Sequence, residues 1–102
     1  MHLIKRPSIL ADAEGCPEDV QSKVKTWCDV VRKAEWQHLE DVRKVYPSAD
    51  KVENFLVFNL KSYRLIVGVN YQSQTVYYKY FLTHQEYDRE EWKKNPHYKK
   101  SN

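Results

Sequence analysis

The sequence predicts an α+β fold: an N-terminal strand and helices packed on one face of an antiparallel sheet, with a helical turn near the C-terminus. Two observations favour this class. Apolar residues recur at helical spacing in the first half of the chain, whereas β-branched and aromatic residues dominate from Phe55 onward. The chain has 102 residues, of which 41% are hydrophobic and 30% charged. It therefore has room for one hydrophobic core.

Prolines mark where the helical segments of the first half begin and end. Residues 2–5 can form a short strand. Pro7 suits the first turn of a helix that stops near Gly15, and Pro17, followed by two acidic residues, opens a second helix. The buried stripe of that second helix is Val20, Val24, Trp27 and Val31. A third, shorter helix should end before Pro47, because the residue preceding proline avoids the helical conformation.

The second half is expected to form a three-stranded antiparallel meander. The strands should lie near residues 52–59, 63–71 and 74–82, with short turns at Lys61-Ser62 and Gln72-Ser73. In the middle strand, alternation turns Leu65, Val67 and Val69 toward the helices and Arg64, Gly68 and Asn70 toward an open face. In the last strand it separates Val76, Tyr78, Tyr80 and Leu82 from Tyr77, Lys79 and Phe81. Lys79 would then share the face of Arg64.

A helical turn should follow the last strand. Thr83 can cap it, because Glu86 lies three residues further on as in a capping box. His84 and Tyr87, three residues apart, would share one side of this turn, and Trp92 can pack inward. We expect one domain over residues 1–94 and a charged, flexible tail over residues 95–102.

Charge and cysteine content narrow the class of protein. The net charge is +3, and residues 53–82 hold three basic side chains against Glu53 alone, so an anionic ligand would favour this region. Cys16 and Cys28 lack metal-site spacing and suit reduced thiols. The charged start lacks the apolar run of a signal peptide, and no apolar stretch approaches the roughly 20 residues of a membrane span. A cytoplasmic protein is the expectation.

Four side chains could handle a phosphodiester: Arg64, Lys79, His84 and Tyr87. Arg and Lys bind phosphate, and His and Tyr move protons without a metal. Each also has an ordinary structural interpretation. Arg64 could be a surface ion-pair partner, Lys79 a guard against edge aggregation, His84 a surface histidine and Tyr87 part of the core.

Other chemistries find little support in the sequence. His84 and Asp88 have i, i+4 spacing, but only His97 could serve as a third metal ligand, so we expect no metal. Neither Ser62 nor Ser73 lies in a nucleophile-elbow pattern. The two glycines of the chain exclude glycine-rich phosphate loops. We expect no cofactor.

Several motifs in order along the chain resemble the HigB-type toxins of the RelE/ParE superfamily. They are Met1-His2-Leu3-Ile4, Lys33-Ala34-Glu35-Trp36, Tyr46-Pro47-Ser48-Ala49-Asp50, Val57-Phe58-Asn59, Tyr63-Arg64-Leu65-Ile66 and Thr83-His84-Gln85-Glu86-Tyr87-Asp88. The resemblance spans about nine tenths of the chain. It implies the RelE-like fold for residues 1–94 and a type II toxin that cleaves mRNA, usually on the translating ribosome. It also implies silencing by a HigA-type helix-turn-helix antitoxin, through which alone DNA would be contacted.

Such an mRNA interferase needs no metal, because the 2′-hydroxyl already lies beside the scissile phosphate. The resemblance assigns phosphate binding to Arg64 with Lys79 in support, and proton transfer to His84 and Tyr87. Asn70, Tyr77 and Lys61 are the expected substrate-binding residues, with Tyr77 stacking on a base. Members of the family often carry Arg at the position of Lys79, which weakens bidentate phosphate contact here. The Lys61-Ser62 turn also replaces a more glycine-rich one.

Two other functions remain open at this point. The same basic sheet and its tyrosines could serve a noncatalytic module that binds RNA or the ribosome. A ParE-like gyrase inhibitor would share the scaffold without nuclease activity, since a fold does not fix a function. New 3′ ends on a message, or inhibited supercoiling, would separate these readings.

Overall fold

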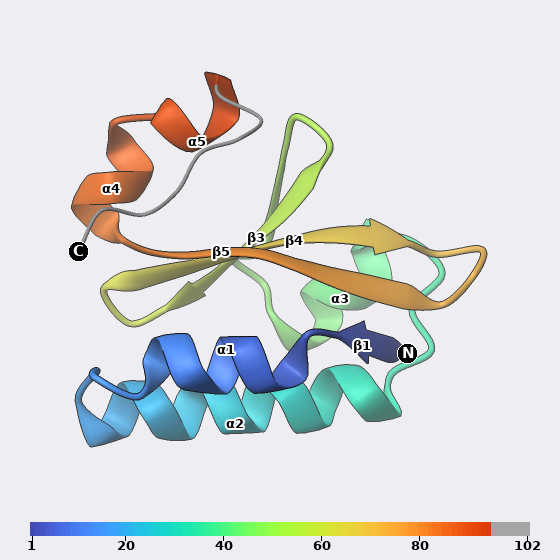
Figure 1. The fold of residues 1–102 in the computed structure, drawn as a ribbon. Helices are drawn as coiled ribbons and strands as arrows, with labels where there is room; N and C mark the ends of the chain where they lie inside the picture. The colour runs from blue at the N-terminus through green and yellow to red at the C-terminus, as the bar shows by residue number, and fades with distance from the viewer. Residues whose placement is uncertain (95–102) are drawn as a thin grey trace.

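The computed structural model describes residues 1–94 and has two helical layers on opposite faces of one sheet (Figure 1). The expected tail, residues 95–102, lies outside the described residues. The helices are α1 (Arg6–Ala13), α2 (Glu18–Lys33), α3 (Leu39–Val45), α4 (His84–Asp88) and α5 (Glu91–Lys94). The strands are β1 (His2–Ile4), β2 (Asp50–Val52), β3 (Phe55–Leu60), β4 (Tyr63–Asn70) and β5 (Thr75–Thr83). This confirms the predicted α+β class.

The sheet has the order β1-β5-β4-β3-β2 and is antiparallel except where β1 pairs with β5. One strand differs from the sequence prediction. The expected strand over residues 52–59 is split, because Glu53 takes a left-handed conformation (φ 56°) and turns the chain between β2 and β3. β1 joins the sheet in parallel beside β5, with Leu3 opposite Val76.

Helix α2 forms the main cover of one face of the sheet. Glu18 and Asp19 lie in its first turn and Arg32 and Lys33 in its last, where they complement the helix dipole. Its apolar residues are buried, as the spacing predicted, and Trp27 packs edge-on against Phe58 of β3 at 5.3 Å. Burial of this stripe holds α2 on the sheet.

A β-bulge in β5 changes which side chains face the helices. Ile66 pairs with Tyr80, but Val67 pairs with Tyr78, so Lys79 is an extra residue without a partner in β4. Beyond the bulge the alternation is inverted. The simple alternation predicted for residues 80–82 is therefore wrong: Phe81 packs on the helix side with Tyr78, and Tyr80 and Leu82 point to the opposite face.

That opposite face is partly covered, whereas the sequence suggested an open face. Trp92 of α5 is 1% exposed and packs with Val57, Ile66 and Leu82, forming a second, smaller core. The cause lies in α4 and α5, which fold back over the end of the sheet (Figure 1). Within residues 1–94, the two short helices thus shield part of this face from solvent.

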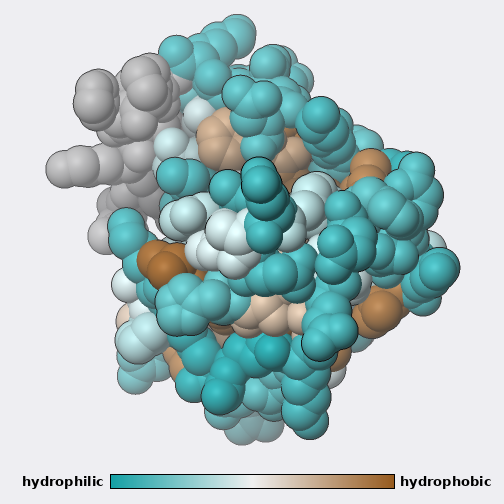
Figure 2. All heavy atoms as spheres, turned by 90° about the vertical axis from the view of Figure 1, so that its right-hand side faces the viewer, coloured by the Kyte–Doolittle hydropathy of each residue, from teal (hydrophilic) through white to brown (hydrophobic). Residues whose placement is uncertain are grey.

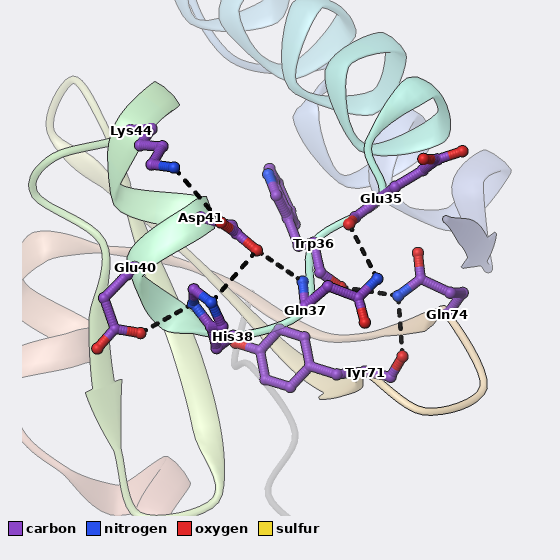
Figure 3. A network of polar contacts seen from close by, with 9 residues as sticks. All are labelled: Glu35, Trp36, Gln37, His38, Glu40, Asp41, Lys44, Tyr71 and Gln74. Carbon is purple, nitrogen blue, oxygen red and sulfur yellow. Dashed lines mark hydrogen bonds and ion pairs between the residues drawn. The ribbon is translucent and has the colours of Figure 1, made fainter.

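The segment between α2 and α3 is tied to the β4–β5 turn by polar contacts (Figure 3). The side-chain amide of Gln74 donates to the backbone carbonyls of Trp36 at 2.7 Å and Tyr71 at 2.8 Å. The Asp41 carboxylate accepts a hydrogen bond from the backbone N–H of Gln37 at 2.9 Å, which lowers the pKa of Asp41. We call these residues the Gln74 network.

The outer surface is mostly hydrophilic on the side that carries the N-terminus and the β4–β5 turn, with apolar patches that are small and separate (Figure 2). Among residues 1–94, the large hydrophobic side chains that are exposed are Val45 and Tyr77. No helix in this described part of the chain is both long and apolar enough to cross a membrane.

Candidate active site

Arg64 lies at the start of β4, on the face that α4 and α5 partly cover. Its Nη1 donates to the backbone carbonyls of Tyr63 at 3.0 Å and Lys61 at 3.3 Å. Its Nη2 lies 3.1 Å from Nδ1 of His84. The guanidinium is thus oriented by backbone groups on one side and by an imidazole on the other, and its remaining N–H donors can meet a ligand.

His84 is held at the first position of α4 by a capping box. The Thr83 hydroxyl accepts from the Glu86 backbone N–H at 3.1 Å, and the Glu86 carboxylate accepts from the Thr83 N–H at 2.9 Å, as the sequence predicted. The backbone N–H of His84 also donates to the carbonyl of Ser62 at 2.9 Å. These bonds fix the end of β5 beside the β3–β4 turn, and so bring His84 to Arg64.

The imidazole of His84 lies between a guanidinium and a carboxylate. Because Arg64 can only donate, Nδ1 must accept, and the ring proton of the neutral tautomer then sits on Nε2. That Nε2 lies 3.2 Å from Oδ2 of Asp88, one helical turn away. The side chains of His84 and Asp88 are 55% and 58% exposed, so a substrate has direct access to both.

Tyr87 links this group to the second core. The Arg64 Cζ lies 5.9 Å from the centre of its ring, and the ring stacks on Trp92 with centres 5.4 Å apart. Burial raises the pKa of the Tyr87 phenol, with a further contribution from the negative charge of Asp50. The phenol is protonated at neutral pH even at its ordinary pKa of 10.0, so it can donate a hydrogen bond.

Lys79 shares the face of Arg64 but lies further along the sheet. An ideal Cβ on Gly68 would come within 3.7 Å of the Lys79 Cε, so the lysine lies over Gly68. Gly68 is four residues from Arg64, or roughly 13 Å along a strand. The structure thus brings Arg64, His84 and Tyr87 together, and Lys79 stands apart from them. An alanine Cβ at position 68 would make only ordinary contacts, so close backbone approach does not require this glycine.

The three expected substrate-binding residues lie at different places. Asn70 is at the far end of β4, roughly 20 Å from Arg64, where its side chain accepts from the Ser73 backbone N–H at 3.0 Å. Tyr77 is 40% exposed and pairs with Gly68. Lys61 lies in the β3–β4 turn, 3.7 Å from the Asp19 carboxylate. Of the three, Lys61 is the one next to the Arg64 group.

Asp88 and Trp92 lie at the site, but the sequence prediction gave neither of them a part in substrate binding or catalysis. Asp88 was considered only as a possible metal ligand with His84, and the same i, i+4 spacing places it on the imidazole. Trp92 was expected in the core, and its stacking on Tyr87 could not be read from spacing because α4 and α5 are separate helices. In the part of the chain that the structure describes, no cluster of three or more His, Cys, Asp and Glu side chains could hold a metal ion.

The arrangement defines a class of protein. Helices on a five-stranded, mostly antiparallel sheet, followed by short C-terminal helices, are consistent with the RelE-like fold. The family model for HigB toxins, the RelE-like toxic component of a toxin-antitoxin system, matches residues 20–90. The chain belongs to this family and is a RelE-like toxin, which implies a cognate antitoxin. A comparison with curated proteins gives no significant match.

Proposed function

We propose that this toxin is a metal-independent endoribonuclease that cleaves mRNA on the translating ribosome, in the cytoplasm. RelE-like toxins are typically ribonucleases. The observation that carries the proposal is the direct contact of Arg64 with His84 and of Arg64 with Tyr87. A guanidinium, an imidazole and a phenol at one exposed place provide phosphate binding and proton transfer without a metal.

The reaction begins with the 2′-hydroxyl beside the scissile phosphate. Its oxygen forms a bond to phosphorus, and the bond from phosphorus to the 5′-oxygen breaks, leaving a 2′,3′-cyclic phosphate and a free 5′-hydroxyl. Attack is intramolecular, so positioning rather than a new nucleophile is required. Arg64 binds the phosphate oxygens and stabilises the charge that builds on them.

In this proposal His84 takes the proton of the 2′-hydroxyl. Without a substrate its Nδ1 accepts from Arg64. A bound phosphate attracts the guanidinium, which frees the Nδ1 lone pair for the hydroxyl proton. Asp88, at Nε2, orients the ring and stabilises the imidazolium that forms. Tyr87, whose phenol is protonated at neutral pH, gives its proton to the leaving 5′-oxygen.

The other residues expected at the site contribute to substrate binding. Lys79 binds phosphate away from the reacting bond, and the exposed Tyr77 stacks on a base. Lys61 and Asn70 already have partners in Asp19 and the Ser73 backbone, so RNA has to compete with these contacts. The cognate partner is a HigA-type helix-turn-helix antitoxin, through which the complex reaches DNA.

Translating ribosomes with a defined message test the function. The wild-type protein should create new 3′ ends that carry a 2′,3′-cyclic phosphate, with or without EDTA. Arg64→Ala should remain folded and create far fewer of them. RNA binding without scission would show a noncatalytic module, and inhibited supercoiling by gyrase would show a ParE-like inhibitor. Either result contradicts the proposal.

A further inference from the structure

A hollow of about 340 Å³ opens beside Trp92 on the face of the sheet that carries Arg64. Its volume is at the lower end of pockets that hold small molecules, which span about 300–1,000 Å³. Residues from β3, β5 and α5 line it. They are Phe55, Lys79, Tyr80, Trp92 and Lys93. We call it the Trp92 hollow.

The walls of the Trp92 hollow are aromatic. Trp92 packs against Phe55 with ring centres 5.6 Å apart and against Tyr80 at 6.4 Å. Phe55 and Tyr80 are partly exposed, whereas Trp92 is buried. Partly exposed aromatic faces around a hollow offer stacking surface to a planar ring, and every nucleobase has such a ring.

Two ammonium groups border these aromatic walls. The ion pairs of residues 1–94 do not include Lys79. Lys93 lies over the Trp92 ring at 6.0 Å and donates to the Glu90 carboxylate at 2.8 Å. An ammonium has three donors, so Lys93 can keep Glu90 and still bind an anion. A planar ring that carries a negative charge can therefore stack on the aromatic walls and pair with the two ammonium groups.

Two stacked rings, those of Tyr87 and Trp92, connect the Arg64 group to the hollow. Tyr87, which contacts Arg64, stacks on Trp92, and Trp92 forms the floor of the hollow. Lys79, which the bulge turns to the face of Arg64, lies over Gly68 and lines the hollow instead of standing beside Arg64. A polynucleotide bound by Arg64 can follow the same face of the sheet along β4 to this hollow, roughly 13 Å away.

We propose that the Trp92 hollow binds a nucleotide of the RNA beyond the one at the scissile phosphate, its base on Phe55 and Tyr80 and its phosphate on Lys79 and Lys93. This inference rests on the proposed ribonuclease function and adds a subsite to it. Glu90 sets the strength of the subsite, because its carboxylate repels the phosphate that Lys93 attracts. Removing this carboxylate should strengthen binding, which a purely structural ion pair would not do.

The test uses a fluorescent RNA oligonucleotide that is 2′-O-methylated throughout and therefore cannot be cleaved. Its affinity is measured by anisotropy from low to moderate salt. Lys79→Gln and Lys93→Gln should each weaken binding about three- to tenfold and reduce the salt slope by about 0.7, the value for one phosphate contact on a single strand. Lys25→Gln is the matched control, since Lys25 is exposed on α2, across the sheet.

Two further variants test the base contact and the Glu90 carboxylate. Phe55→Leu keeps an apolar side chain but removes the stacking face, and should weaken binding roughly tenfold. Glu90→Gln should tighten binding about twofold. Circular dichroism confirms that each variant is folded.

The outcomes separate the subsite from the enzyme. If Lys79→Gln and Lys93→Gln behave like Lys25→Gln while the wild type cleaves mRNA, the subsite and the phosphate contact of Lys79 are refuted, and the nuclease function stands. If the slopes change as expected but no message is cleaved, the subsite stands and the nuclease proposal fails. Loss of antitoxin affinity in Phe55→Leu with unchanged RNA affinity would assign the hollow to the antitoxin and overturn the inference.

Discussion

The two ends of strand β4 both carry polar side chains, but they use them differently. At the Asn70 end, the Gln74 network joins side chains to backbone groups, such as the carbonyls of Trp36 and Tyr71. At the Arg64 end, Nη1 of Arg64 also donates to two backbone carbonyls, but the remaining contacts are between side chains. Nη2 of Arg64 meets His84, and His84 meets Asp88.

This difference separates structural from functional polar groups. A side chain bonded to a partly buried backbone carbonyl leaves that carbonyl less well satisfied when it moves away. Two exposed side chains bonded to each other can separate at little cost when a ligand offers better partners. The Gln74 network should therefore govern stability, and the Arg64 group should govern activity.

Arg64→Ala is the strongest test of this division. Cleavage should fall by roughly 10² to 10³, the usual scale for one charge-stabilising donor, while the melting temperature stays near that of the wild type. Arg64→Lys should restore a part, because an ammonium provides charge without the planar fork. Message cleavage on ribosomes and thermal melting measure the two effects. Wild-type cleavage by folded Arg64→Ala would refute the assignment.

Gln74→Ala should show the reverse pattern. It removes two side-chain bonds to backbone carbonyls and should cost about 1–3 kcal/mol of unfolding free energy. The melting temperature should then fall by about 4–8 °C for each kcal/mol. Cleavage at a temperature where the variant is folded should be unchanged. A loss of activity in this folded state would break the comparison.

Asp88→Asn should have a smaller effect, confined to activity. The His84–Asp88 pair is more than half exposed, so its contribution to the reaction is expected to be about 1 kcal/mol or less, a factor of about five in rate. Single-turnover cleavage measures it, and urea unfolding should be unchanged. A loss of stability would place Asp88 with the structural group.

The smallest expected effect is the loss, at low pH, of the contribution of Asp41 to stability. The Gln37 N–H lowers the pKa of Asp41 in the folded state below its ordinary 3.8, so its stabilising contribution is present above that value. It is lost as the pH falls through the lowered pKa. Urea unfolding of wild type and Asp41→Asn should differ at pH 6 and converge below about pH 3.8. An equal difference at both pH values would contradict this.

Local sequence signals predicted much of the fold. The stripe of α2, the strands around Arg64 and the Thr83 cap depend on neighbours in the chain, and these predictions are confirmed. The parallel pairing of β1 with β5 depends on residues more than 70 positions apart, and no local pattern encodes it. The bulge could not be predicted from the sequence either, because the residues on both sides of Lys79 have the same aromatic character.

The candidate site was predictable to the extent that it follows local structure. The distance from His84 to Tyr87 and Asp88 follows from one helical turn, and Arg64 reaches them because β4 and β5 are neighbours. The separation of Lys79 from Arg64 was not predictable, because it depends on the register in which β5 pairs with β4, where Arg64 lies opposite Leu82. The catalytic roles of all four residues stay predictions until the variants above are measured.

The extra residue at Lys79 makes β5 sensitive to length rather than to composition. Deleting one residue there would restore regular pairing with β4. The side chains would then keep a single alternation between the two faces along the whole strand. Residues on one side of the deletion would then face the opposite side of the sheet. Either Phe81 would become exposed, or Val76 and Tyr78 would turn away from the core. A mutational scan should accordingly find single-residue deletions in β5 far more harmful than substitutions at Lys79 itself.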